Sequence, residues 1–175
     1  RAKASVHQVA ENALDVPHTA FLHGGLFRKD GVRNRIRCVI ERFADHAVCE
    51  YIGEPRPEGL AARLLSPSGG IVTHFDRFFL PSILQVEYRI GDENHIVLNG
   101  ACTPVDDYDT RLYAVVTVRS RIPSWLLRPV VQPVALYIFS QDAVVLARQT
   151  EAIHRFGEEA YASTDVDLLG PHILR

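Results

Sequence analysis

The stretch from residue 83 to residue 119 decides the fold, and it opens with ILQVEYRI (83–90), GDEN (91–94) and HIVLNGAC (95–102). The first run alternates apolar and polar side chains, the polar GDEN segment is typical of a tight turn, and the run after it is expected to pair back. A third run, RLYAVVTVR (111–119), is rich in β-branched residues, which favour strands. We therefore expect three consecutive antiparallel strands in this part of the chain.

Three further strands are predicted upstream of this stretch. RIRCVIER (35–42) alternates with period two, residues 47–52 are its expected hairpin partner, and residues 71–80 are another candidate. Loops are expected elsewhere, at EPRPEG (54–59), SPSGG (66–70), PVDDYD (104–109) and the proline-interrupted segment 122–138, which is predicted to be loops and broken helix. The acidic 104–109 loop is expected to be a solvated turn.

Helices are predicted at both ends of the strand region. Residues 5–23 have a helical pattern that Gly24 and Gly25 end, and Pro17 should kink or break this helix because proline lacks a backbone N–H. Ser140 is the expected N-cap of a long amphipathic helix over residues 141–162. One helix, about six antiparallel strands and a long helix make an α+β layer, in which a curved sheet wraps the C-terminal helix.

Composition fits one compact domain with a hydrophobic core. The chain has 175 residues, 47% of them hydrophobic, and a net charge of −2. No basic block typical of nucleic-acid binders occurs, no signal peptide is recognisable, and the longest apolar run, near residues 130–139, is too short to span a bilayer. Three cysteines without close pairs favour a reducing cytoplasm. Because the chain starts at Arg1 and lacks Met, we expect a piece of a longer protein or a processed chain.

Polar side chains gather near the end of the first predicted helix, in NALDVPHTAFLH (12–23). Asn12, Asp15 and His18 lie three residues apart and so share one helix face. His23 follows His18 by five residues, about 140° away on an ideal helix, so a straight helix cannot bring both imidazoles to one ion. A chain that is unwound at the proline and at the glycines can bring both imidazoles to one ion. Spacing alone leaves open both a metal site and an ordinary helix end.

The motif E-N-x-x-D-x-x-H-x4-H, within ENALDVPHTAFLHGGL (11–26), resembles the signature of Rieske non-haem iron oxygenases. It is most similar to the branch that includes pheophorbide a oxygenase and the vanillate and dicamba O-demethylases. TPVDDYDTRLY (103–113) is similar to a threonine–arginine strand of that branch, and FSQDAVVLARQ (139–149) to its glutamine–aspartate helix start. The resemblance covers most of the chain. It implies a helix-grip (START-like) antiparallel β-sheet wrapped around a long C-terminal helix.

The resemblance also implies a mononuclear iron site. His18 and His23 are its expected histidine ligands and Asp142 its expected carboxylate, and such a set leaves positions open for O2. Taken by itself, Asp142 is better explained as an aspartate near a helix N-terminus. Asp15 is expected to bridge the iron histidine to a histidine of a Rieske [2Fe–2S] cluster on a neighbouring subunit. Asn12 is expected near the iron at longer range.

The implied activity is Fe(II)- and O2-dependent hydroxylation or oxidative demethylation of an aromatic or hydrophobic substrate. Electrons would come from NAD(P)H through a ferredoxin or reductase and the Rieske cluster. The cysteine–histidine pairs that hold such a cluster are missing here, so residues 1–175 are expected to be the mononuclear iron catalytic domain without its N-terminal Rieske domain. The full-length protein is expected to be a cytoplasmic homotrimer with no nucleic-acid partner and no membrane span.

Two other functions remain open at this point. The first is a metal-free helix-grip module that binds a hydrophobic ligand or a partner, in which His18, His23 and Asp142 would be scattered. The second keeps the metal site but fills it with zinc for a hydrolytic role. The distances between the three side chains distinguish a metal-free module from an iron site. Elemental analysis, together with dependence on O2, distinguishes a zinc site from an iron site.

Overall fold

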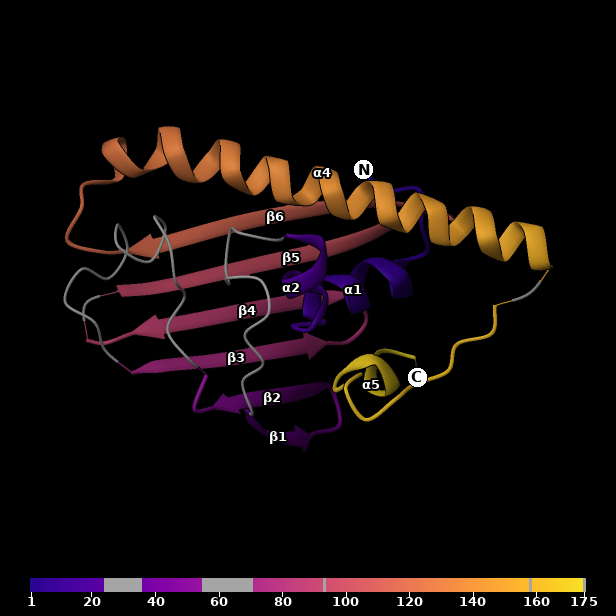
Figure 1. Ribbon diagram of the computed structural model, residues 1–175, viewed down its shortest axis with the longest axis horizontal. Helices are drawn as coiled ribbons and strands as arrows, with labels where there is room; N and C mark the ends of the chain where they lie inside the picture. The colour runs from indigo at the N-terminus through magenta and orange to yellow at the C-terminus, as the bar shows by residue number, and fades with distance from the viewer. Residues whose placement is uncertain (24–35, 55–70, 93, 158, 175) are drawn as a thin grey trace.

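A single antiparallel sheet with helices against it makes up the computed structural model, which describes residues 1–23, 36–54, 71–92, 94–157 and 159–174 (Figure 1). The sheet has six strands in the order β1 to β6, and each pairs with the next along the chain. The strands are β1 (Arg37–Arg42), β2 (His46–Ile52), β3 (Val72–Phe79), β4 (Ile83–Ile90), β5 (Asn94–Asp106) and β6 (Asp109–Arg119). The predicted strands are confirmed, although β5 and β6 extend into the expected 104–109 loop. Gly24, Gly25 and most of the expected loops at 54–59 and 66–70 lie outside the described residues.

The helices are α1 (Val6–Leu14), α2 (His18–Leu22), α4 (Ser124–Phe156) and α5 (Gly170–Ile173). A capping box starts α1, because the Ser5 hydroxyl accepts from the Gln8 N–H while the Gln8 side chain accepts from the Ser5 N–H. The first predicted helix is thus two helices, with Pro17 immediately before α2. Proline has no N–H to continue α1, so the predicted break is confirmed.

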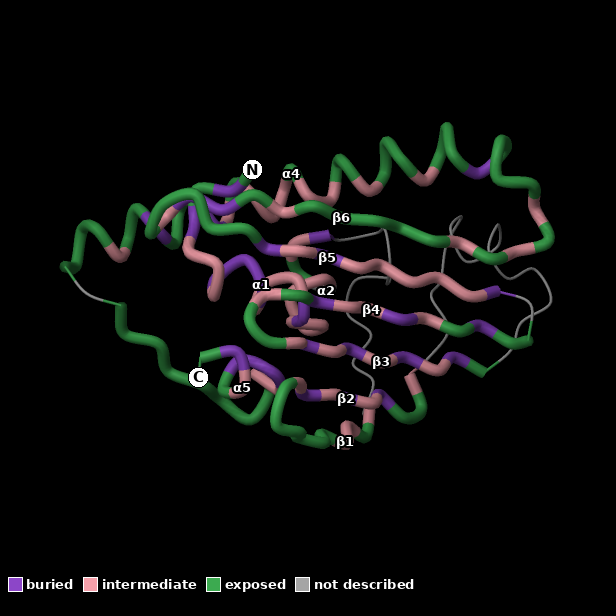
Figure 2. The backbone as a smooth tube through the Cα atoms, turned by 180° about the vertical axis from the view of Figure 1, so that it is seen from behind, coloured by how far each residue is buried: buried purple, intermediate pink, exposed green. Residues whose placement is uncertain are grey.

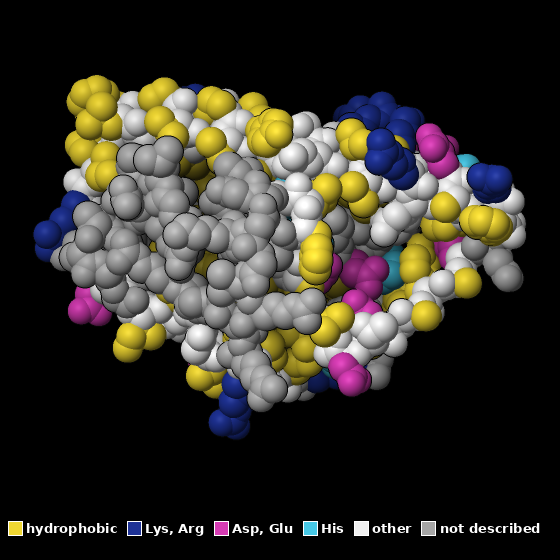
Figure 3. All heavy atoms as spheres, in the orientation of Figure 1, with side chains coloured by type: hydrophobic (Ala, Val, Ile, Leu, Met, Phe, Trp, Pro, Cys, Tyr) yellow, Lys and Arg dark blue, Asp and Glu magenta, His cyan; other side chains and the backbone are white. Residues whose placement is uncertain are grey.

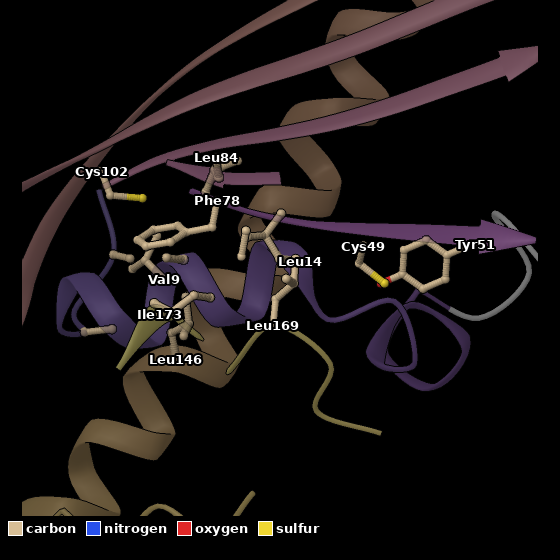
Figure 4. Packing of buried hydrophobic residues seen from close by; sticks show 14 residues of the cluster. Val9, Leu14, Cys49, Tyr51, Phe78, Leu84, Cys102, Leu146, Leu169 and Ile173 are labelled. Carbon is tan, nitrogen blue, oxygen red and sulfur yellow. The ribbon is translucent and has the colours of Figure 1, made fainter. Parts of the chain in front are cut away.

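The hydrophobic core lies between one face of the sheet and the helices (Figure 4). Along β3 every second residue is buried, as the alternating colours of Figure 2 show, and Phe78 on this side of the strand belongs to the core. The core includes Val9, Leu14, Phe78, Leu84, Leu146, Leu169 and Ile173. Burying each leucine of this set contributes roughly 1.5–3 kcal/mol, so the core fixes α1 and the second half of α4 against the sheet.

The prediction of loops and broken helix over residues 122–138 is wrong. These residues lie largely within α4, which is one helix of 33 residues with Pro129 and Pro133 inside it. Each proline leaves the carbonyl four residues earlier without its helical partner, and this part of α4 is largely exposed, so water can replace the lost hydrogen bonds. The predicted N-cap, Ser140, is inside the helix, where its hydroxyl donates to the Tyr137 carbonyl oxygen at 2.6 Å.

By length and composition alone, α4 is long and apolar enough to cross a membrane. The apolar run judged from the sequence was too short, because residues 122–138 were not expected to be helical. Much of the apolar stretch is exposed, whereas Leu146 and Thr150 further along α4 are buried against the domain. The absence of a membrane span therefore stays a prediction.

The prediction of a solvated 104–109 turn fails at Asp109, whose side chain is only 8% exposed. Its carboxylate accepts hydrogen bonds from Arg1 and Lys3. The next residue, Thr110, forms a β-bridge with Ala2 and donates its hydroxyl to the Ala4 carbonyl oxygen at 2.9 Å. These contacts hold the first residues of the chain against β6 and so determine where α1 begins.

A buried charged cluster lies on β3. His74 Nδ1 is 2.7 Å from Glu54 Oε2 and its Nε2 is 3.0 Å from Asp76 Oδ1. The ring stacks between Tyr51 and Tyr88, with centroid distances of 4.3 and 3.9 Å. Burial lowers the pKa of His74, but the two carboxylates outweigh it and raise the pKa to about 9. His74 is therefore an imidazolium at neutral pH.

We predict that the wild type loses stability between pH 6.5 and pH 9 in a way that a His74→Gln variant does not. Since the folded-state pKa is raised, the proton on His74 contributes its full stabilisation below the unfolded-state pKa of about 6.5, and this is lost as pH rises through about 9. Urea unfolding at pH 6, 7.5 and 9 should show a pH-dependent difference between the two proteins of about 1–3 kcal/mol. Parallel pH dependences would contradict the assignment.

Candidate metal centre

The two histidines of the first motif converge because the chain between them is barely helical. His18 is the first residue of α2, which has only five residues. His23 is the C-cap of α2 with φ −106° and ψ 40°, outside the helical region. The straight-helix separation of about 140° therefore does not apply. His18 Nε2 and His23 Nε2 lie 3.3 Å apart.

α4 brings Asp142 to the same point. Asp142 Oδ1 is 3.1 Å from His23 Nε2 and 3.6 Å from His18 Nε2. Within the described ranges, these three residues are the one group of three or more His, Cys, Asp or Glu side chains whose ligand atoms lie within 4.8 Å of one another. The space-filling view shows acidic and histidine side chains gathered over α1, between α4 and α5 (Figure 3). The scattered arrangement that a metal-free module requires is not found.

Both rings turn their other nitrogen toward an acceptor. His18 Nδ1 contacts the Asp15 carbonyl oxygen, and His23 Nδ1 is 2.9 Å from Gln141 Oε1. A carbonyl oxygen can only accept, so the proton of a neutral His18 ring is on Nδ1, and its Nε2 carries a lone pair. The same holds for His23 when the Gln141 amide presents its oxygen.

The site consequently attracts positive charge. Two Nε2 lone pairs face each other and Asp142 Oδ1, a buried atom that accepts no hydrogen bond from the described residues. Burial lowers the pKa of His18, but contacts with Asp142 and the Asp15 carbonyl, together with both carboxylates, outweigh burial and raise the pKa overall. A cation between the three atoms, either a proton or a metal ion, removes their mutual repulsion.

The spacing of the three atoms fits a metal ion. Ligand atoms about 2.1 Å from one ion are about 3.0 Å apart as neighbours in an octahedron and about 3.4 Å apart in a tetrahedron. The three distances, 3.1, 3.3 and 3.6 Å, are all close to the tetrahedral value, and the shortest is also close to the octahedral one. Two neutral imidazoles and one carboxylate also form the donor set that leaves open positions on non-haem Fe(II).

Asp15 lies beside this group but touches it mainly through its backbone. Its carboxylate Oδ2 is 3.9 Å from His18 Nδ1, while its carbonyl oxygen makes the hydrogen bond to that nitrogen. Burial raises the pKa of the Asp15 carboxyl group. Asn12 is half-buried near the end of α1. It takes part in none of the contacts of His18, His23 and Asp142 described above. The predicted roles of both residues stay predictions.

The sequence reasoning gave no role to Gln141, although the glutamine–aspartate helix start that resembles the family contains it. Gln149 is another glutamine of α4. Gln149 is exposed, whereas Gln141 is half-buried and contacts His23. The position of Gln141 directly before Asp142 was the available signal, but an amide side chain does not by itself indicate a metal site.

Comparisons with known proteins indicate the family and the fold of the chain. The family model for the vanillate O-demethylase oxygenase C-terminal domain matches residues 2–175. Dicamba monooxygenase bound to 3,6-dichlorosalicylic acid superposes with a TM-score of 0.79 at 14% identity, covering 99% of this chain and 54% of that chain. NdmA of Pseudomonas putida CBB5 with caffeine gives 0.71 at 21% identity, covering 99% and 47%. NdmB of the same organism gives 0.70 at 16% identity, covering 98% and 45%. Comparison with curated sequences gave no match.

The chain spans about half the length of these solved proteins. Their identities are low, so the structural likeness establishes the shared fold, and the predicted helix-grip arrangement is confirmed. The match to the family covers nearly all of the chain. The chain therefore belongs to the vanillate O-demethylase oxygenase C-terminal domain family, within the Rieske non-haem iron oxygenases that its first-helix motif resembles.

Proposed function

We propose that this chain is the mononuclear iron domain of a Rieske-type oxygenase, an oxidoreductase that hydroxylates or oxidatively demethylates an aromatic or hydrophobic substrate with Fe(II) and O2. The observation that supports this most directly is the convergence of His18 Nε2, His23 Nε2 and Asp142 Oδ1 within 3.6 Å. Family membership supports iron over zinc and oxidation over hydrolysis.

In this proposal His18, His23 and Asp142 hold the iron through those three atoms. When bound, Fe(II) supplies the binding and activation of O2. The protein holds the rings in the correct tautomer through the acceptors at Nδ1, so that both Nε2 lone pairs are available. The His23 side chain is 1% exposed and that of Asp142 is 13% exposed, so little water reaches the protein side of the site.

Asp15 is proposed to connect the iron histidine to the histidine of a Rieske cluster on a neighbouring subunit. Its side chain is 31% exposed, so a second subunit can reach it, and it is also close to His18. Asn12 would lie further from the iron and contribute polarity. Both assignments rest on the motif that they share with the family.

The whole protein is proposed to be longer than this chain, because the similar solved proteins are about twice its length. Its additional part would be an N-terminal domain with a Rieske [2Fe–2S] cluster, reduced by NAD(P)H through a ferredoxin or reductase. A cytoplasmic homotrimer would bring the cluster of one subunit next to the iron of another. The similar proteins were solved with dicamba or with caffeine, which are small ring compounds, and this supports a small aromatic substrate.

The metal site is tested by anaerobic titration with Fe(II). The wild type should bind one equivalent, and His23→Ala or Asp142→Ala should weaken binding at least about 100-fold, because each removes one of three protein ligands. A His46→Ala variant is the control, since His46 lies on β2 and pairs with Asp45. Equal iron in the wild type and in a His18→Ala/His23→Ala double variant would refute the site.

Asp15 is tested in a protein that contains both domains. Asp15→Asn should leave the iron content unchanged and slow O2-dependent product formation at least about 10-fold, because the hydrogen bond between the two redox centres is weakened. Single-turnover kinetics with a prereduced cluster measure this step directly. Asp107→Asn, in the exposed β5–β6 turn, should behave as the wild type. If Asp15→Asn shows the same single-turnover kinetics as the wild type, the proposed bridging role of Asp15 is refuted.

A further inference from the structure

We propose that Gln141 is a positioning residue, which fixes the tautomer and the orientation of His23 and keeps the charge of the metal-loaded site positive. This inference rests on the proposed function, because it assumes that a metal ion binds between His18, His23 and Asp142. Gln141 does not contact the ion in this arrangement. It acts through the far side of one ligand ring.

Two consecutive residues of α4 hold the two nitrogens of His23. Asp142 Oδ1 is 3.1 Å from Nε2, and Gln141 Oε1 is 2.9 Å from Nδ1. With a partner at each nitrogen, the ring cannot rotate about its Cβ–Cγ bond without losing both contacts. His18 is held differently, by the Asp15 carbonyl oxygen of its own segment. Only His23 therefore depends on a side chain that is 118 residues away in sequence.

Tyr137 contacts the other end of the Gln141 amide. Gln141 Nε2 donates to the Tyr137 hydroxyl at 3.3 Å, one helical turn earlier on α4. With Nε2 on this hydroxyl, the accepting end of the amide, Oε1, faces His23 Nδ1. The proton of the neutral ring is then on Nδ1, and Nε2 keeps the lone pair that a metal requires.

The neutral amide also sets the charge of the site. A divalent ion with one carboxylate and two neutral imidazoles has a net charge of +1. A carboxylate at position 141 would make Nε2 of His23 more basic and would lower the net charge to zero. A Glu at this position should therefore hold a divalent cation at least as tightly as Gln, whereas an apolar side chain of similar size should hold it less tightly.

The experiment compares anaerobic Fe(II) affinity in the wild type, Gln141→Leu, Gln141→Glu and Tyr137→Phe. Gln141→Leu should weaken binding about 10–100-fold, since it leaves the buried Nδ1–H of His23 without this acceptor. Gln141→Glu should bind Fe(II) at least as tightly as the wild type. In Tyr137→Phe the Fe(II) affinity should fall by less than about 10-fold. Gln149→Leu, at an exposed position of the same helix, is the matched control and should bind as the wild type.

A second measurement reports the tautomer itself. In protein loaded with Zn(II), 15N NMR of the histidine rings should give a slowly exchanging Nδ1–H for His23 in the wild type and in Gln141→Glu. In Gln141→Leu this proton should exchange faster, which a purely structural role of Gln141 does not require. If Gln141→Leu does not fold, the Fe(II) affinity of Gln141→Glu still tests the proposal.

Two results would overturn the proposal. One is Fe(II) affinity and Nδ1–H exchange in Gln141→Leu equal to those of Gln149→Leu. The other is a loss of affinity in Gln141→Glu of 10-fold or more, because that variant retains the acceptor. If the wild type binds Fe(II), either result refutes only the proposed role of Gln141 and leaves the proposed function standing. A wild type that does not bind Fe(II) removes the proposed function and this inference with it.

Discussion

The mutual repulsion of three electron-rich atoms is the constraint on which the rest of the structure depends. His18 Nε2, His23 Nε2 and Asp142 Oδ1 lie 3.1–3.6 Å apart, and a folded chain keeps such atoms together only if a positive charge lies between them or if rigid elements hold them there. The structure supplies the rigid elements. The start of the chain is held at β6 by Asp109, and α4 is packed through Leu146. A metal ion or a proton bound between the three atoms would supply the positive charge.

Patterns within one segment predicted much of the fold, because those features depend on local physics. The period-two alternation of residues 83–90 predicted β4 correctly to the residue. The break at Pro17 follows from a missing N–H and needs no tertiary information. The same reasoning failed for α4, since three prolines close together ordinarily end a helix. Whether a helix tolerates Pro129 and Pro133 depends on whether water can reach the carbonyls that they leave free, and burial is not visible in the sequence.

Only those residues of the candidate site that belong to a recognisable motif could be predicted from the sequence. His18 and His23 lie in one short segment, but Asp142 joined them only through the resemblance to a family, since its separation in sequence gives no distance in space. Gln141 could not be identified, because its function depends on facing a ring from another part of the chain. For the same reason Asp109 was expected to be solvated. Its partners, Arg1 and Lys3, are more than a hundred residues away in sequence.

Two buried histidine–carboxylate clusters among the described residues, one at His74 and one at His18 and His23, differ in what faces each ring nitrogen. Both nitrogens of His74 face carboxylates, so the ring holds two protons, its pKa is raised to about 9, and no lone pair is left for a metal ion. At His18 and His23 the Nδ1 atoms face a neutral carbonyl and a neutral amide, and only the Nε2 atoms face the acid. A neutral acceptor at Nδ1 fixes the proton of a neutral ring on that atom, so the Nε2 lone pairs point toward the acid. Burial and a nearby carboxylate are common to both clusters. The clusters differ in what converges: one ring lies between two acids at His74, whereas two rings and one acid meet within 4.8 Å at His18, His23 and Asp142, which is the arrangement that can hold a metal ion.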